Sequence, residues 1–173
     1  MMAMKSALKE GLPQLGLDLT EDTQNTLCAF GHAVVEQNKV MNLTAITQPE
    51  QVAKLHLLDS ISLLSVMPLA GKKVIDVGCG AGFPGVPLKI ACPEAKVTLL
   101  DSLGKRMNWL EMAVPALGVE NAEFVTARAE EAVATRRESY DFATSRAVAR
   151  LNILLELTAP YVKVGGAVLA MKG

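Results

Sequence analysis

The sequence predicts an α/β fold, in which a parallel sheet with helices on both faces follows a helical cap. Two observations predict this fold. From residue 72 onward, short apolar runs alternate with segments of helical spacing, which is the pattern of parallel strands joined by crossover helices. A loop with four glycines follows the first of these runs, at residues 78–85. At the carboxyl end of a parallel strand, such a loop lets a ligand approach the backbone closely.

Length and composition fit a single globular domain. The chain has 173 residues, of which 50% are apolar and 20% are charged, so a packed core can form. Charged residues interrupt every apolar run, which excludes a transmembrane helix of ~20 residues. The amino-terminal residues carry no secretory signal, and the three cysteines have no C-x-x-C spacing, so neither a disulfide framework nor a zinc site is expected. We therefore expect a cytoplasmic protein with no membrane partner and no metal site.

Residues 1–70 are predicted to form a helical cap packed on a core at residues 71–173. Thr20 is a typical helix N-cap residue, and apolar side chains recur at helical spacing after it. A helix is therefore expected there. A connection is expected at residues 42–49. A second helix is expected from about Glu50 to Met67, and it is apolar on more than one face, so that both sides would be covered.

Five strands are predicted in the core, at residues 74–77, 97–100, 124–125, 140–145 and 167–171. Helices are predicted at residues 87–91, 104–117 and 151–160, and a turn is predicted at Gly165 and Gly166. Glu130 is expected in the loop after the third strand. The fifth strand is expected either inside the sheet or beside an edge whose normal cover is missing, because buried parallel strands need neighbours.

Two kinds of nucleoside ligand are compatible with the glycine loop. The last three glycines satisfy G-x-G-x-x-G, which predicts a dinucleotide and hence a nucleotide-dependent oxidoreductase. Reading from Gly78 gives D-x-G-x-G-x-G, which is typical of enzymes that use S-adenosylmethionine (SAM). The carboxylate of Asp76 would suit the cationic amino acid part of SAM better than a pyrophosphate. Asp101, at the end of the next strand, can accept both ribose hydroxyls of either ligand, so it does not choose between them.

Three further polar residues are candidates for the site. His56 and Asp59 lie three residues apart on one helix face. The alternatives for them are a surface hydrogen bond, a half-buried His56 that is satisfied inside the protein, and a polar patch that faces the crevice. Arg146 follows the fourth strand, over the carboxyl edge of the sheet, where catalytic side chains gather. The sequence contains no G-x-S-x-G elbow, no H-E-x-x-H and no Walker A loop, which argues against hydrolase, zinc-protease and P-loop chemistry.

Together these motifs resemble the RsmG (GidB) family of bacterial 16S rRNA guanine-N7 methyltransferases. The matching segments are residues 42–45, 56–60, 76–85, 100–106, 145–147 and 172–173. The resemblance implies a Rossmann-like, class I SAM-dependent methyltransferase sheet behind an N-terminal helical cap. Family members continue past the Lys-Gly pair into a last helix and a strand pair. The resemblance therefore also implies that C-terminal strands are missing and that the core is truncated.

The resemblance implies methyl transfer from SAM to N7 of guanine 527 in the 530 loop of 16S rRNA. Arg146 is the implied catalytic residue, at the reaction centre. The residues expected to contact SAM, from the loop and the resemblance together, are Asp76, Gly78, Gly80, Gly82, Phe83, Asp101, Ala129, Glu130 and Arg146. N7 of guanine carries a lone pair and no proton, so the reaction needs no general base, which agrees with the missing catalytic motifs.

Contacts to the RNA are expected to be local, because the net charge of −1 gives no overall basic signature. Aromatic residues are only 4% of the chain, which argues against binding mainly by base stacking. The expected substrate contacts are His56, Asp59, Lys105, Arg106 and Arg150, and the pair Arg136 and Arg137 is a further candidate for phosphate contacts. The implied partner is 16S rRNA or the 30S subunit.

Alternatives stay open for both assembly and function. A monomer is expected, and a dimer through the exposed final strand is the alternative. The first alternative function is a nucleotide-dependent oxidoreductase on the same sheet. The second is a fragment that binds SAM but is inactive because of the truncation.

Overall fold

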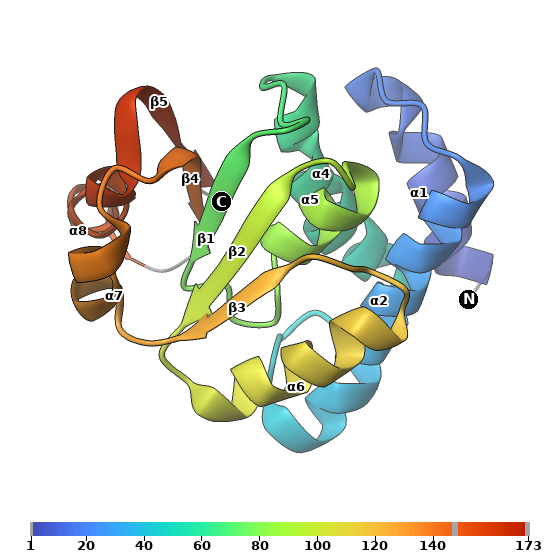
Figure 1. The fold of residues 1–173 in the computed structure, drawn as a ribbon. Coiled ribbons are helices and arrows are strands. Elements are labelled where there is room, and N and C mark those ends of the chain that lie inside the picture. The colour runs from blue at the N-terminus through green and yellow to red at the C-terminus, as the bar shows by residue number, and fades with distance from the viewer. Residues whose placement is uncertain (1, 147–148, 172–173) are drawn as a thin grey trace.

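The computed structural model describes residues 2–146 and 149–171, and it confirms the predicted α/β fold. Its five-stranded sheet has the order β3-β2-β1-β4-β5, and every neighbouring pair is parallel. The strands are β1 (Lys73–Val77), β2 (Lys96–Asp101), β3 (Glu123–Thr126), β4 (Tyr140–Arg146) and β5 (Val162–Met171). From β1 the chain first builds the sheet outward to β3 and then returns to the other side of β1 with β4 (Figure 1). This reversal is a topological switch point, where open α/β sheets bind ligands beyond the carboxyl ends of the strands.

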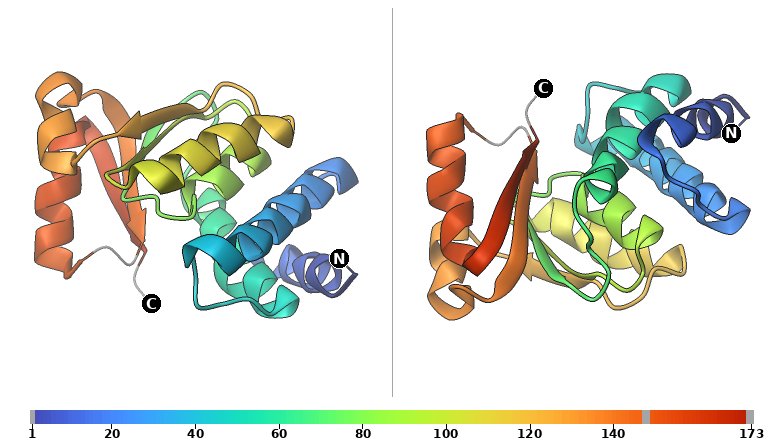
Figure 2. Two further views of the ribbon diagram at one scale, coloured as in Figure 1. Left: turned by 90° about the horizontal axis from the view of Figure 1, so that it is seen from below. Right: turned by 90° about the horizontal axis from the view of Figure 1, so that it is seen from above.

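Helices cover both faces of the sheet, as Figure 1 and Figure 2 show. One face carries α5 (Gly85–Ala91) and α6 (Gly104–Ala116), and the other carries α7 (Ala129–Arg136), α8 (Leu151–Thr158) and the short turn η4 (Ala159–Tyr161). The hydrophobic core is divided accordingly into two clusters. The smaller cluster lies on the α7 side and includes Ile75, Leu100 and the rings of Tyr140 and Tyr161, whose centroids are 6.2 Å apart.

Helices also form most of the N-terminal part of the chain. They are α1 (Met2–Gly11), η1 (Pro13–Leu15), α2 (Glu21–Met41), α3 (Pro49–Val52), η2 (Ala53–Leu58), α4 (Asp59–Ile61) and η3 (Ser62–Ser65). Thr20 caps α2, because its side chain accepts a hydrogen bond from the Thr23 backbone N–H at 3.2 Å. The second expected helix is a run of short pieces, of which η2 is a π-helical turn. Such turns often lie at functional sites.

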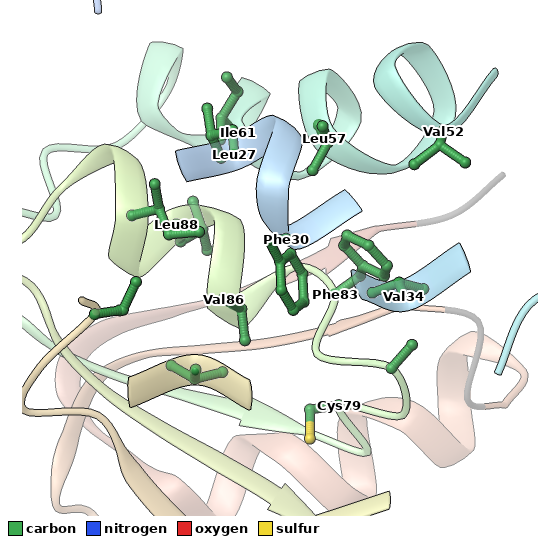
Figure 3. Packing of buried hydrophobic residues seen from close by; sticks show 14 of the residues in the cluster. Leu27, Phe30, Val34, Val52, Leu57, Ile61, Cys79, Phe83, Val86 and Leu88 are labelled. Atoms are coloured by element: carbon green, nitrogen blue, oxygen red, sulfur yellow. The ribbon is translucent and has the colours of Figure 1, made fainter. Parts of the chain in front are cut away.

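Buried aromatic side chains join α2 to the sheet. Phe30 of α2 is fully buried, and its ring centroid lies 5.3 Å from that of Phe83 and 6.5 Å from that of Trp109. Figure 3 shows the Phe30 ring between Val86 and Phe83. One continuous cluster of buried side chains thus spans the N-terminal helices, α5, α6 and the face of the sheet that carries α5 and α6.

Helix α7 corrects the expectation of a loop after β3. Glu130 lies in the first turn of this helix. None of its described residues is fully buried, and Ala132 and Val133 pack on the core only partly buried. A helix with so weak an apolar stripe gives no periodic signal in the sequence.

Strand β5 corrects the turn expected at Gly165 and Gly166. The strand runs through both glycines, and its register with β4 shifts between Tyr140 and Phe142. Glycine suits such a bulge, because a Cβ on Gly166 would collide with the backbone carbonyl of Asp141. β5 lies at one edge of the described sheet and not in its interior.

Candidate active site

A cavity of about 560 Å³ opens at the carboxyl ends of the strands, next to the switch point between β1 and β4. Its volume lies in the range of small-ligand sites. Of the residues expected to contact SAM, those on the cavity wall are Gly78, Gly80, Phe83, Asp101, Ala129, Glu130 and Arg146. Of the expected substrate contacts, His56 and Arg106 lie on the wall. Segments that are far apart in the chain therefore meet at one cavity.

The other expected site residues do not line this wall. Asp76 and Gly82 are buried, Asp76 completely. Asp59 and Lys105 are exposed, on α4 and on the first turn of α6. Arg150 is exposed directly before α8. These five residues can therefore act on a ligand in the cavity only through another group or at its rim.

Positive φ angles explain the glycines of the loop. The angle is +71° at Gly78, +56° at Gly80 and +96° at Gly82. Residues with a Cβ enter this region only at an energetic cost. A Cβ on Gly82 would meet the side chains of Val86 and Leu110, whereas a Cβ on Gly80 would point into open space. Gly82 is thus needed for packing, and Gly80 leaves the backbone accessible from the cavity.

Asp101 holds the glycine loop in place. Its Oδ2 accepts a hydrogen bond from the Gly80 N–H at 2.9 Å, and its Oδ1 accepts one from the Leu103 N–H at 2.9 Å. Each carboxylate oxygen has a second lone pair. The carboxylate on the cavity wall can therefore brace the loop and still accept hydroxyl groups of a ligand.

Asp76 is a buried carboxyl group beneath the same loop. Its Oδ2 accepts a hydrogen bond from the Gly85 N–H at 2.8 Å, where α5 begins. Its Oδ1 has no hydrogen-bond partner among the described residues. Burial raises the pKa of Asp76 to about 7. The loop therefore covers one acceptor that no described residue uses.

Three side chains stack at the other end of the cavity. The rings of His56 and Phe83 lie 4.7 Å apart between centroids and are inclined by 20°. The guanidinium carbon of Arg146 lies 5.1 Å from the centre of the Phe83 ring. Arg146 Nη1 donates to the Leu55 carbonyl at 3.0 Å and lies 3.4 Å from Asp59 Oδ2. The strand-end arginine is thus anchored to η2 and α4 of the N-terminal part.

The loop after α2 reaches the same stack, which the sequence did not reveal. Asn38 Oδ1 accepts hydrogen bonds from the backbone N–H groups of Leu43 at 2.6 Å and Thr44 at 2.8 Å. Thr44 Oγ1 in turn lies 2.8 Å from His56 Nε2. For Leu43 and Thr44, the only signal in the sequence is that residues 42–45 match the RsmG motif, and that match does not specify a partner.

Arg136 lies at the opposite end of the sheet from the cavity. Its guanidinium pairs with Glu123, the first residue of β3, at 2.7 Å, and donates to the Tyr140 hydroxyl at 2.8 Å. The ion pair lowers the pKa of Glu123 below its usual range. Arg136, expected as a phosphate contact, therefore already has an internal partner at the amino ends of the strands.

Within residues 2–146 and 149–171, no helix is long and apolar enough to span a bilayer. The same ranges hold no group of three or more His, Cys, Asp or Glu side chains that could bind a metal ion. The cysteines are free. Cys79, inside the glycine loop, is buried, and burial raises the pKa of its thiol well above the usual range, so it stays protonated.

Solved methyltransferase structures share this fold. Precorrin-6y C5,15-methyltransferase from Geobacter metallireducens superposes with a TM-score of 0.54 at 13% identity, covering 65% of this chain and 60% of that one. M. jannaschii TYW2, solved in complex with AdoMet (SAM), gives a TM-score of 0.51 at 16% identity, covering 61% of this chain and 48% of that one. The expected Rossmann-like, class I methyltransferase sheet is thereby confirmed.

Sequence comparison identifies the family. The family profile for rRNA small subunit methyltransferase G (GidB) matches residues 23–173. The ribosomal RNA small subunit methyltransferase G of Alkaliphilus metalliredigens is 46% identical over 175 residues, covering 99% of this chain and 73% of that protein. A match over most of the chain, together with a relative at this identity, shows that the chain belongs to the rRNA small subunit methyltransferase G family.

Proposed function

We propose that the protein transfers a methyl group from SAM to N7 of guanine 527 in the 530 loop of 16S rRNA. The observation that carries the proposal is the meeting of Phe83, Arg146 and the glycine loop at one cavity, in a chain of this rRNA methyltransferase family. Family membership favours SAM over a dinucleotide for the same loop. It also makes small-subunit rRNA the natural substrate class.

The residues of the cavity fit SAM. Asp101 has free lone pairs for the ribose hydroxyls, next to the accessible backbone of Gly80. Ala129 and Glu130, at the start of α7, would contact the adenine side. The unpartnered Oδ1 of Asp76 beneath the loop would act on the cationic amino acid end through a bridging water. Phe83 and Arg146 would line the reacting end of the site.

The protein needs to position the guanine more than to move protons. SAM, when bound, supplies an electrophilic methyl group on its sulfonium. N7 of guanine has an in-plane lone pair and no proton, so the protein has to hold the base at about 3–3.5 Å in line and exclude water. A guanidinium has more N–H donors than the contacts of Arg146 use, and we assign the remaining donors to O6 of the guanine or to SAM.

The surroundings of the cavity assign roles to the remaining residues. Residues 1–70 would act as a cap that closes the cavity, because Leu43, Thr44 and His56 stand on its wall. Lys105, Arg106 and Arg150 would contact RNA phosphates at the rim. The target base has to leave its stack to reach the cavity. We propose that the enzyme acts as a monomer on the 30S subunit.

The test is transfer of labelled methyl from SAM to 30S subunits that lack the modification, with the product mapped by nucleotide. The Alkaliphilus metalliredigens relative serves as a positive control for the subunits. A mark at N7 of the one guanine would support the proposal. No transfer from a folded, SAM-binding protein, while the control is active, would contradict it. A parallel fluorescence titration with NADH tests the oxidoreductase alternative, and we expect no binding.

A further inference from the structure

The hydrogen bonds of Arg146 determine which nitrogen of His56 carries the proton. The Leu55 carbonyl oxygen and His56 Nδ1 lie 3.1 Å apart. Arg146 Nη1 lies 3.0 Å from that oxygen, and Arg146 Nη2 lies 3.0 Å from that nitrogen. A guanidinium only donates hydrogen bonds. Nδ1 therefore has to be an acceptor. The two terminal nitrogens of Arg146 donate to two neighbouring acceptors, the Leu55 carbonyl oxygen and His56 Nδ1.

The proton of the neutral ring is consequently on Nε2, where it meets Thr44. His56 is buried, and this burial, together with the charge of Arg146, lowers the pKa of His56 to about 4, so the ring is neutral at pH 7. Nε2–H then donates to Thr44 Oγ1 at 2.8 Å. Thr44 Oγ1 also accepts from the Ile46 N–H at 3.0 Å. Two donors thus converge on the threonine hydroxyl, as its two lone pairs allow.

We propose that Thr44 and His56 are positioning residues for Arg146. The donors of Arg146 select the Nε2–H tautomer of His56, Thr44 accepts the Nε2 proton and fixes the ring, and the free Nδ1 then holds the guanidinium beside Phe83. The inference rests on the proposed function, and it replaces the expected substrate contact of His56 by an internal role. Both ring nitrogens are engaged inside the protein, and neither is available to RNA.

The alternative tautomer shows why the choice matters. A proton on Nδ1 would point at a donor of Arg146, so the bond from Nη2 would be lost. Arg146 from β4 and Asp59 from α4 are the charged groups that act on His56 among the described residues. Without Nδ1, Arg146 would keep only the Leu55 carbonyl and the longer contact to Asp59 at 3.4 Å. The guanidinium would then be held less tightly beside Phe83.

The first test reads the tautomer directly and needs no activity. The chain has two histidines, His32 and His56, so the imidazole nitrogens of ¹⁵N-labelled protein can be assigned by comparison with His32→Gln and His56→Gln. Two-bond ¹H–¹⁵N correlations at pH 7 should show His56 protonated on Nε2 and unprotonated on Nδ1. Arg146→Met should raise the population of the Nδ1–H form, because Nδ1–H can then donate to the Leu55 carbonyl. An Nδ1–H ring in the wild type would overturn the inference, even if the methyltransferase is active.

The second test uses matched pairs of variants in the methyl-transfer assay. Thr44→Ser keeps the hydroxyl acceptor, whereas Thr44→Val has nearly the same shape without it. We expect Thr44→Val to lower kcat by about tenfold and Thr44→Ser by less than about threefold, with SAM affinity unchanged in both. Equal kcat values for the two variants would contradict the inference.

Substitution of the histidine gives the converse comparison. The amide oxygen of His56→Asn can take the position of Nδ1 and accept from Arg146, whereas the amide of His56→Gln reaches the position of Nε2. We expect His56→Asn to retain at least about fivefold more activity than His56→Gln. The opposite order would overturn the inference. An inactive wild type would refute the proposed function, and the NMR experiment would still decide the tautomer.

Discussion

Asp76 shows how strongly burial can change a single residue. Its folded-state pKa of about 7 lies above the ~3.9 of an exposed aspartate. Between these values the folded protein binds more protons than the unfolded chain. The stability that this carboxyl group contributes is therefore fully present below about pH 4 and is lost as the pH rises to about 7.

We expect Asp76→Asn to remove this pH dependence. Asparagine keeps an acceptor for the Gly85 N–H but does not titrate. Relative to the wild type, the free energy of unfolding of the variant should rise between pH 4 and pH 8, by at most about 4 kcal/mol. Urea unfolding at both pH values measures this difference, with Asp18→Asn on the surface as the control. If Asp76→Asn followed the wild type at both pH values, the buried carboxyl group would not be titrating.

Individual site residues differ in how far the sequence could predict them. Asp101 and Arg146 end β2 and β4, and Phe83 lies in the loop after β1, so chain order alone places them at the carboxyl edge of the sheet. The contact between Thr44 and His56 joins a loop to a π-helical turn twelve residues later. No periodic pattern encodes such a contact, because it depends on how the loop after α2 folds back over the cavity.

Among the structural elements, the glycine loop offers the sharpest comparison. Gly80 and Gly71 both have positive φ, +56° and +73°, and a Cβ on either would meet open space. Of these two glycines, only Gly80 lies on the cavity wall. Alanine at either position should cost about 1–2 kcal/mol of stability from the left-handed backbone. We expect Gly80→Ala to weaken SAM binding by more than tenfold as well, because its methyl group would enter the cavity.

Calorimetric titration with SAM measures this effect, and Gly71→Ala is the control with the same backbone strain. SAM binding to Gly71→Ala should match the wild type within about twofold. Equal SAM affinities of the two alanine variants would show that the ligand does not approach the backbone at Gly80.

A strong burial pattern makes an element easy to predict from the sequence, as β1 and β2 show. β1 and β2 are buried over nearly their whole length, so they stand out as continuous apolar runs. The first half of β5 has no such pattern, since Val164 is 94% exposed. Helix α7 lacks a fully buried residue, which is why its sequence resembles a loop. Neighbouring strands and helices, not local sequence, determine these two elements.

Across the whole molecule, the two ends of the sheet carry different chemistry. The carboxyl end holds the cavity, with Arg106 on its wall. The amino end holds a separate hollow lined by Lys73, Lys96 and the Arg136–Glu123 pair. The pair neutralises one cation there. At physiological salt, charges act over only about 8 Å. RNA that enters the cavity would therefore be attracted by the cations at the carboxyl end of the sheet and not by those at the amino end.

Arg106 and Arg137 test whether RNA binding depends on the cations at the carboxyl end of the sheet. Substitution of either residue by glutamine removes one positive charge. Arg106 lies beside the cavity, and Arg137 is exposed shortly before β4, at the amino end. We expect Arg106→Gln to reduce the slope of log Kd for 30S subunits against log salt by about one, and Arg137→Gln to leave it unchanged. Equal reductions would mean that the overall charge governs binding. An unchanged slope for Arg106→Gln would remove this residue from the RNA contact, and the rim would then depend on Lys105 and Arg150.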